Sequence, residues 1–359
     1  MKEFGSDFHY ISDFQGKGNT LSDFYPHANY YADGRQALIH LYHSQGWQRL
    51  WMPEYFCYDV IASLKEFGLN LMFYQDWPDD HNESETLENI QRKGRFLPTD
   101  AVLRVNYYGT RKYRSAEKLP VAAVVEDHTH DLIGDWPIHS TADWCIASLR
   151  KTLPIPEGGM LWSPMGLKLP EQPATSEENE RIAAIRWEAM RLKAGYLAGK
   201  PIEKATFRAG YVDTEEYFDT ASVCALDKAS QEYLRTLDIR AWYNRKRENW
   251  ELLSDISKDG IQIIRPESIG CYPFSLVFLF DDPGERDRVR KELIEHQIYP
   301  AVLWNVPDTA SDEVKSFSRR MLSIHCDGRY TADDIRQMKE ILVKVIGYRE
   351  GFKVQCFET

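Results

Sequence analysis

The sequence lacks paired cysteines, long apolar runs and an excess of basic residues. Its six cysteines are scattered over 359 residues without a CxxC pair or the spacing of a zinc site. We therefore expect free cysteines and a cytoplasmic protein. No stretch approaches the length of a membrane span, and the first residues lack the apolar segment of a signal peptide, so we expect no membrane association.

The charge balance is acidic, with 44 Lys and Arg residues against 55 Asp and Glu residues and a net charge of -11. Proteins that bind nucleic acids broadly present basic surfaces, so we expect no nucleic-acid partner. The sequence also lacks internal repeats and low-complexity tracts. Hydrophobic residues make up 43% of the chain, which suffices for a sizeable core and for more than one typical domain.

Helical and strand patterns alternate in the first half of the chain. Asp33 is a plausible cap for a helix that ends at Gly46, and a second helix is expected over residues 60–68. Strands are expected over residues 49–53, 69–74, 101–109 and 121–128. The last two are almost wholly apolar before their polar ends, which favours central strands of a parallel α/β sheet.

The pattern changes in the second half of the chain. Helices are expected over residues 176–197 and, as one long element, over residues 222–256. Beyond these, the sequence predicts strands at 271–280 and 298–304 and helices at 285–297 and 331–347. We therefore expect three parts: an N-terminal arm (1–30), a large α/β domain (31–240) and a small C-terminal α+β domain (241–359).

Two early segments are candidates for ligand contact. Gly34, Arg35 and Gln36 begin a predicted helix, where free N–H groups and the helix dipole favour a phosphate group. This signal is weak alone, because every helix start carries such groups. Tyr55 and Phe56 lie in an aromatic cluster after a predicted strand. Such clusters usually serve packing, but they can also cover a flat heterocycle.

A third segment, "VVEDHTH", places Asp127 at the carboxyl end of an apolar strand, where α/β sheets bind ligands. His130 follows three residues later. A solvated turn is the simplest interpretation of a lone aspartate here. A metal site built from Asp127, His128 and His130 is a further alternative, although no additional ligands are evident, and we predict no metal.

The fourth segment is "SLRKTLPIPEGG", which contains Lys151. Two prolines and a Gly-Gly pair fix the backbone after this lysine, and Ser148 precedes it by three residues. A lysine at the end of an element often lies along the surface with its charge in water. The rigid segment behind Lys151 instead favours a chemical role.

Taken in this order and spacing, the segments resemble the DegT/DnrJ/EryC1/StrS sugar aminotransferases, which are pyridoxal-phosphate enzymes of fold type I. "VVEDHTHDLIGD" is similar to the family's aspartate segment. "KTLPIPEGG" is similar to the segment from the family's lysine to its Glu-Gly-Gly, and "DGRQAL" is similar to its phosphate loop. The resemblance implies a large domain with a mostly parallel sheet, a small C-terminal domain and a homodimer.

The resemblance also implies an activity and roles for the candidate residues. Lys151 would form an aldimine with pyridoxal 5'-phosphate, and Asp127 would pair with the pyridine nitrogen. The other implied cofactor contacts are Gly34, Arg35, Gln36, Tyr55, Phe56, His130 and Ser148. The implied reaction transfers an amino group from an amino acid, commonly glutamate, to a keto sugar that is linked to a nucleotide.

The sequence departs from the family pattern at several positions. Asp33 and Arg35 replace the Ser and Thr of the phosphate loop. Ile146 replaces a phosphate-binding Ser, for which Ser148 is a substitute. Cys57 stands where a ring-stacking aromatic residue is expected, and residues 205–222 replace a Gly-Tyr-Asn-x-Arg segment.

These departures leave other functions open. One is another pyridoxal-phosphate reaction, by a lyase, dehydratase or epimerase, and another is a non-catalytic binding protein on the same fold. A metal hydrolase is a further alternative. Arg208 and Arg329 are candidates for binding a substrate carboxylate.

Overall fold

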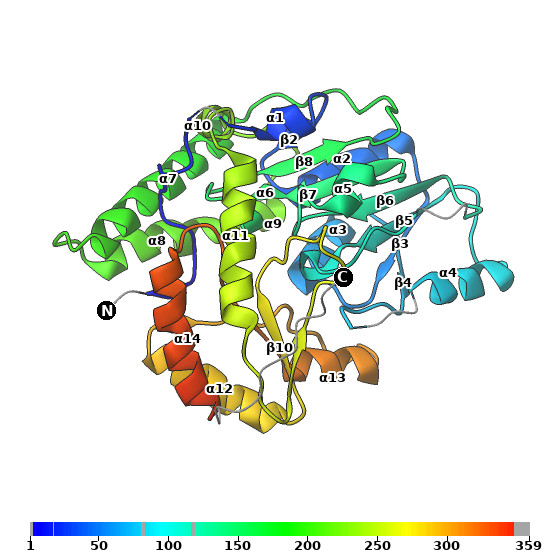
Figure 1. The fold of residues 1–359 in the computed structure, drawn as a ribbon. Helices are drawn as coiled ribbons and strands as arrows, with labels where there is room; N and C mark the ends of the chain where they lie inside the picture. The colour runs from blue at the N-terminus through cyan, green and yellow to red at the C-terminus, as the bar shows by residue number, and fades with distance from the viewer. Residues whose placement is uncertain (1–2, 17, 80–82, 116–118, 348–359) are drawn as a thin grey trace.

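A seven-stranded sheet forms the centre of the larger part of the protein (Figure 1). The computed structural model describes residues 3–16, 18–79, 83–115 and 119–347. The strands lie in the order β2-β8-β7-β6-β5-β3-β4. Their bounds are Asn29–Tyr31 (β2), Arg49–Pro53 (β3), Leu71–Tyr74 (β4), Asp100–Val105 (β5), Ala123–Asp127 (β6), Trp144–Ser148 (β7) and Gly159–Trp162 (β8). The strands β3 to β7 pair in parallel and β8 is antiparallel to both neighbours, which confirms the predicted mostly parallel sheet.

Helices cover both faces of this sheet. Their bounds are Leu21–Phe24 (α1), Gly34–Gln45 (α2), Tyr58–Glu66 (α3), Glu83–Arg92 (α4), Asp135–His139 (α5), Leu149–Thr152 (α6), Glu177–Leu197 (α7), Lys204–Glu215 (α8), Tyr217–Thr220 (α9), Lys228–Leu234 (α10), Ile239–Ser254 (α11), Pro283–Glu295 (α12), Asp312–Arg320 (α13) and Ala332–Ile346 (α14). Adjacent residues of a strand face opposite sides. Val125 accordingly packs in the same core as Leu38 of α2, whereas Val124 packs in the core that includes Trp187 of α7.

Local sequence explains the bounds of α2. The Asp33 carboxylate accepts a hydrogen bond from the Gln36 backbone N–H (2.9 Å), which caps α2. Gly46 ends the helix with a φ of 66°, a left-handed conformation that glycine adopts without a steric penalty. The predicted helix over residues 33–46 is therefore confirmed.

The single long helix predicted over residues 222–256 is wrong. The chain instead forms α10 and α11, with a break at residues 235–238. Each helix has its own cap, because Asp227 accepts from the Ser230 N–H and Asp238 accepts from the Ala241 N–H. Before α10 the chain is extended, and the Leu226 N–H donates to the carbonyl of Tyr30.

A three-stranded antiparallel sheet organises the C-terminal part, in the order β12-β10-β9. Its strands are Ile261–Ile264 (β9), Leu276–Phe280 (β10) and Met321–Ile324 (β12). The helices α12 and α14 pack on this sheet, and α11 runs from the large sheet down to α14 and β10 (Figure 1). The strand predicted over residues 298–304 is short. Ile298–Tyr299 (β11) pairs with Phe4–Gly5 (β1) of the N-terminal arm, and Ala301 forms a single antiparallel bridge to Ser323 of β12.

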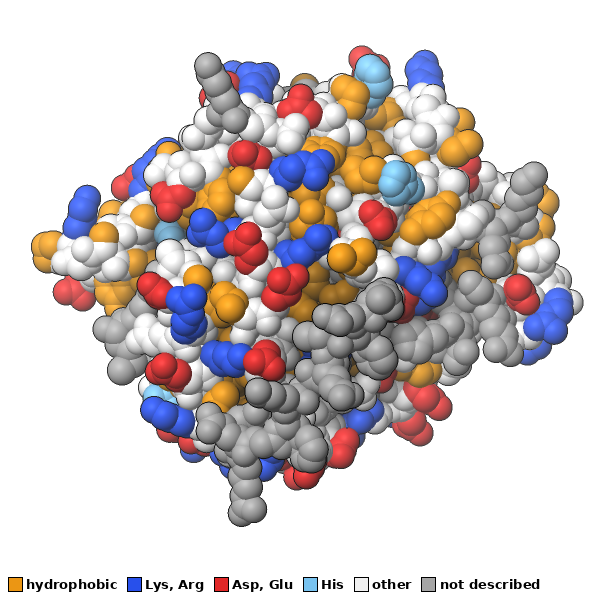
Figure 2. Space-filling model, in the orientation of Figure 1, with side chains coloured by type: hydrophobic (Ala, Val, Ile, Leu, Met, Phe, Trp, Pro, Cys, Tyr) orange, Lys and Arg blue, Asp and Glu red, His pale blue; other side chains and the backbone are white. Residues whose placement is uncertain are grey.

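The surface agrees with the mixed composition of the chain. On the face shown in Figure 2, basic and acidic side chains of the described residues are interspersed. No helix in the described ranges is long and apolar enough to cross a membrane. The five cysteines that lie in these ranges are free, while Cys356 lies outside them.

Candidate functional site

A cavity of about 200 Å³ opens at the carboxyl ends of β5, β6 and β7. Its walls come from the start of α2, the start of α3, the turn after β6, the segment after β7, the helices α8 and α9, and a loop of the C-terminal part. The predicted residues among its lining are Gly34, Arg35, Phe56, Asp127, His130, Ser148 and Lys151. Segments separated by more than 100 residues in the sequence therefore meet at the carboxyl ends of the parallel strands, which is where α/β sheets bind ligands.

Lys151 lies on the short helix α6 and exposes its side chain to this cavity. No described residue forms a hydrogen bond or ion pair with its ammonium group. The neighbouring positive charge of Arg150, together with burial, lowers the pKa of Lys151 to about 8. A lysine with such a pKa is partly neutral near physiological pH, which is the form that attacks an aldehyde.

The rigid segment behind Lys151 is buried, and its glycines are required by close packing. A Cβ atom on Gly159 would lie 2.0 Å from the Asp33 carbonyl oxygen. Gly158 has a φ of 130°, and its N–H donates to the Ala32 carbonyl (2.6 Å). The Gly-Gly pair thus allows the segment after Lys151 to pack directly against the start of α2.

Asp127 is held by a residue that the sequence analysis did not identify. Its Oδ1 atom accepts hydrogen bonds from the backbone N–H and the hydroxyl of Thr129, at 2.9 and 2.6 Å. Thr129 Oγ1 in turn accepts from the Ser148 N–H (2.9 Å), which ties the end of β6 to the end of β7. The spacing Asp-x-Thr is typical of a turn closed by the aspartate side chain, and this spacing could have identified Thr129.

The second carboxylate oxygen of Asp127 has no hydrogen-bond partner among the described residues, and the side chain lines the cavity. Burial raises the pKa of this carboxyl group, although the bonds from Thr129 act in the opposite direction. A cationic or N–H-bearing group in the cavity would therefore be stabilised by Asp127.

His130 also faces the cavity and is held in one tautomer. Its Nδ1 atom accepts a hydrogen bond from the Tyr108 N–H (3.0 Å). Burial, with the charges of Lys246 and Lys151, lowers the pKa of His130 to about 3, so the ring is neutral. The neutral ring then carries its proton on Nε2, which makes that atom a hydrogen-bond donor.

Aromatic side chains form one wall of the cavity. Trp304, from the C-terminal part, stacks on His130 (6.0 Å between ring centres, 23° between planes) and lies 5.8 Å from the Phe56 ring. Trp304 was not predicted from the sequence, because nothing in the local pattern of residues 298–304 indicates that this loop crosses to the large sheet.

The predicted residue Tyr55 is not part of the lining. It is fully buried behind Trp304, and its hydroxyl group donates to the Leu303 carbonyl, as does that of Tyr108 (2.7 Å). These two tyrosines hold the loop that carries Trp304.

The start of α2 forms another wall. A Cβ atom on Gly34 would lie 2.9 Å from the Cβ of Ser148, so only glycine allows this approach. Gln36 points away from the cavity, and its side-chain oxygen accepts from the Cys224 N–H (3.0 Å). Arg35 lines the cavity and pairs with Asp219.

Asp219 and Glu215 belong to the segment that replaces the family's Gly-Tyr-Asn-x-Arg sequence. In the structure this segment forms α8 and α9, and both acidic side chains line the cavity. Glu215 pairs with Arg150 (2.9 Å). These two acids were not predicted as site residues from the sequence, although residues 205–222 were recognised as a departure from the family pattern.

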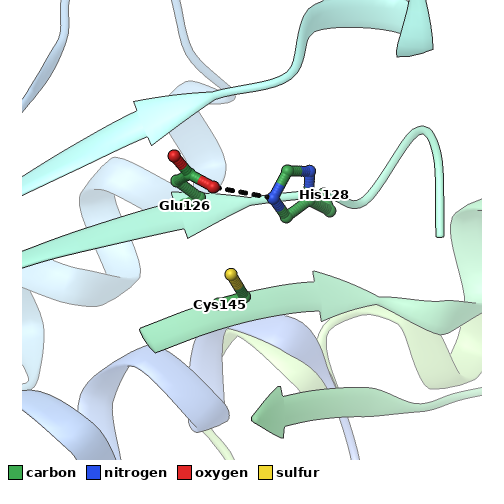
Figure 3. A group of neighbouring side chains, drawn as sticks. All are labelled: Glu126, His128 and Cys145. Carbon is green, nitrogen blue, oxygen red and sulfur yellow. Dashed lines mark hydrogen bonds and ion pairs between the residues drawn. The ribbon is translucent and has the colours of Figure 1, made fainter. Parts of the chain in front are cut away.

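The alternative metal site does not assemble from Asp127, His128 and His130. Asp127 and His130 line the cavity, whereas His128 lies on the opposite side of β6 with Glu126 (Figure 3). Because successive residues of a strand face opposite sides, Asp127 and His128 cannot bind the same metal ion.

Glu126, His128 and Cys145 do come together on that opposite face (Figure 3), with possible ligand atoms within 4.8 Å of one another. Their polar atoms are already engaged. The Glu126 carboxylate accepts from Ser140 (2.6 Å), contacts His128 (3.1 Å) and forms an ion pair with Arg104 (3.3 Å). The positive charge of Arg104 opposes a cation here, so we interpret the cluster as a buried hydrogen-bond network.

The two arginines considered for a substrate carboxylate are not among the lining residues. Arg329 pairs with Asp327 (2.9 Å) and donates to the Asp7 carbonyl, which anchors the N-terminal arm. Arg208 is exposed on α8. Within the described lining, Arg35 and Arg150 supply the guanidinium groups.

Comparison with known proteins gave matches in structure only. No protein-family model matches the sequence, and no curated protein matches it. Among solved structures, a DegT DnrJ EryC1 StrS aminotransferase from Brucella abortus has a TM-score of 0.57 at 14% identity, covering 91% of this chain and 88% of that one. The PLP form of the putative sugar aminotransferase Spr1654 from Streptococcus pneumoniae has a TM-score of 0.63 at 12% identity, covering 96% and 99%.

A third solved structure is that of DesI in the presence of its TDP-sugar product. Its TM-score is 0.55 at 17% identity, and the match covers 92% of this chain and 86% of that one. These likenesses extend over nearly the whole of each chain. The protein therefore has the fold of the fold type I sugar aminotransferases, as the sequence resemblance predicted.

Proposed function

We propose that this protein is a pyridoxal-phosphate-dependent aminotransferase. It transfers an amino group from an amino acid, with glutamate as the expected donor, to a nucleotide-linked keto sugar. The observation that carries the proposal is the meeting of Lys151, Asp127 and His130 in one cavity, at the carboxyl end of the sheet in this fold.

The residues of the cavity fit pyridoxal phosphate. Lys151 offers a free amine of lowered pKa, and Asp127 offers a carboxylate oxygen without a partner in the described chain. Phe56 and Trp304 supply flat apolar surfaces. The group would be held by these residues with His130, Ser148 and Arg35. When bound, it supplies an electron sink that stabilises negative charge on the donor's Cα.

Each of the chain's own groups then has a defined task. Lys151 Nζ would hold the aldehyde carbon with loss of water and, once the donor's amine displaced it, would carry the proton that leaves the donor's Cα. Asp127 would accept a hydrogen bond from the ring nitrogen and favour its protonated form. His130 donates from Nε2 into the cavity, and the side chains of Leu303 and Trp304 exclude water.

The solved relatives support the choice of substrate class. Spr1654 is described as a putative sugar aminotransferase, and DesI was solved with a TDP-sugar product. A nucleotide-linked sugar is therefore the first acceptor to test. A homodimer in the cytoplasm is part of the proposal, supported by the family resemblance and the free cysteines. Light scattering that gave the mass of one chain would contradict the dimer.

The decisive experiment is to trap the lysine. The purified protein is incubated with pyridoxal phosphate, reduced with borohydride, and digested for mass spectrometry. We expect a visible imine band that disappears on reduction, with the label on Lys151. Lys151→Ala should lose the band and keep the fold, whereas the surface control Lys168→Ala should keep both. A label spread over surface lysines, or a reducible imine in Lys151→Ala, would overturn the proposal.

A further inference from the structure

Both arginines of the cavity are paired with acidic residues from one segment of the chain. Arg35 Nη1 lies 2.5 Å from Asp219 Oδ1, and Arg150 Nη2 lies 2.9 Å from Glu215 Oε1. Asp219 belongs to α9 and Glu215 is the last residue of α8. The guanidinium groups that would hold an anion in this cavity are therefore already bound to carboxylates.

Burial differs between the two sides of these pairs. The side chains of Arg35 and Arg150 are 9% and 11% exposed, whereas those of Asp219 and Glu215 are 46% and 51% exposed. Arg35 is fixed further by Asp33, 3.4 Å away. The arginines are thus fixed in the wall. Asp219 approaches from the rim and can move into water, whereas Glu215 is held more firmly, because its Oε2 atom also pairs with Arg186 (3.0 Å).

A phosphate monoester would compete with these carboxylates. It carries up to two negative charges and three acceptor oxygens, and arginine binds it through paired hydrogen bonds. Acidic residues outnumber Arg and Lys in the cavity lining, so an added phosphate gains little attraction while Asp219 and Glu215 stay in place.

We propose that Asp219 and Glu215 are built-in competitors of phosphate, which a phosphate monoester must displace from Arg35 and Arg150 to bind in the cavity. The inference rests on the proposed function, because that function places the cofactor in this cavity. The phosphate can belong to the cofactor or to the substrate. In either case, the α8–α9 segment regulates how tightly the anion binds.

The test compares Asp219→Asn with the wild type and with Asp59→Asn. Asp59 lines the same cavity but pairs with neither arginine, so its substitution removes the same charge without releasing an arginine. The affinity of each protein for pyridoxal phosphate and for pyridoxal is measured from the imine absorbance. Because the half-exposed Asp219 no longer competes for Arg35, Asp219→Asn should bind pyridoxal phosphate about fivefold more tightly.

Pyridoxal, which lacks the phosphate, should bind equally to all three proteins. A fivefold gain in affinity for pyridoxal phosphate alone shows that the phosphate that competes with Asp219 is that of the cofactor. A gain confined to uridine diphosphate, added to the borohydride-reduced protein, identifies a phosphate of the substrate. No gain with either ligand, or an equal gain in Asp59→Asn, would overturn the inference.

Inorganic phosphate separates this inference from the proposed function. Its affinity, measured by calorimetry, should also be higher in Asp219→Asn than in the wild type and Asp59→Asn. If no protein forms an imine on Lys151 but phosphate binding rises in Asp219→Asn, the proposed function fails and the competition stands. If the imine forms and Asp219→Asn leaves phosphate affinities unchanged, the competition fails and the proposed function stands.

Discussion

At the scale of single residues, the charges around Lys151 determine its reactivity. Arg150 precedes it in the chain, lines the same cavity and is the main cause of its lowered pKa. Burial and Arg35 act in the same direction, whereas Glu215 and Cys57 raise the pKa. The other ionisable residues of the lining are Asp33, Asp59, Asp127, His130 and Asp219. The amine is nucleophilic only when neutral, so imine formation should speed up as the pH rises towards about 8 and level off above it.

Replacing Arg150 should move this pH profile upwards. Arg150→Gln removes a nearby positive charge, so the ammonium form of Lys151 becomes more stable and its pKa rises, by about 1 pH unit. The measurement is the initial rate of imine formation with pyridoxal between pH 6 and about 10, a range that spans both ordinary and lowered lysine pKa values. Pyridoxal avoids any contact between the arginine and a phosphate group.

Arg150→Lys keeps the positive charge and serves as the control, with a profile close to that of the wild type. A profile of Arg150→Gln that coincides with the wild type, or that moves to lower pH, would show that Arg150 does not control this amine.

At the scale of elements, caps and hydrophobic periodicity predicted those segments whose ends are set locally. The helix α2 begins at Asp33 and ends at Gly46 as expected, and α14 begins after Thr331. The break between α10 and α11 was missed. The helical pattern continues through it, and the cap at Asp238 was not recognised. The available signal was Asp238 itself, because aspartate is a preferred N-cap residue and can start a new helix within a continuous helical pattern.

Thr331 should contribute measurably to stability although it is far from the cavity. Its hydroxyl accepts from the Asp334 N–H (3.3 Å), and Asp334 in return accepts from the Thr331 N–H (2.9 Å). We expect Thr331→Ala to lower the free energy of unfolding by about 1 kcal/mol, measured by urea denaturation. Thr331→Ser keeps the capping oxygen and should behave like the wild type. An alanine variant as stable as the serine variant would contradict this role.

The candidate site could be predicted for those residues that lie close to one another in the sequence. Asp127, His130, Ser148 and Lys151 lie at the ends of two adjacent strands, in the turn after the first and on the short helix after the second, and the structure brings all four to one cavity. Trp304 was not predictable, because its position depends on a loop of the C-terminal part held by Tyr55 and Tyr108. Contacts of that kind follow from tertiary packing, which no local pattern encodes.

At the scale of the whole molecule, α11 joins the two parts of the chain. Trp242, near its start, packs in the core beneath the large sheet, and Leu253, near its end, packs in the C-terminal core. Trp242 Nε1 donates to the Thr152 carbonyl, directly after Lys151 (2.9 Å). Its ring also contacts Phe14 of the N-terminal arm, at 5.3 Å between ring centres. One side chain thus contacts the arm, the site and the connecting helix.

Truncating this side chain should destabilise the whole protein. Trp242 is fully buried, and we expect Trp242→Ala to lower the free energy of unfolding by about 3–5 kcal/mol. Urea denaturation followed by circular dichroism measures the change. Trp242→Phe retains most of the apolar contact and should lose clearly less. A loss in the alanine variant below about 1 kcal/mol would show that the surrounding core does not depend on this ring.

The alternation of side chains along β6 has a consequence for insertions and deletions. Asp127 faces the cavity, and its neighbours Glu126 and His128 meet on the other side of the strand. Removing one residue earlier in this strand, with the pairing to β5 and β7 retained, would reverse every later side chain. Asp127 would then face Cys145 and Ser140, and an imidazole would replace the carboxylate in the wall of the cavity that holds Lys151. A library of single-residue deletions should therefore tolerate losses in the exposed loop at residues 165–168 and reject them within Ala123–Asp127.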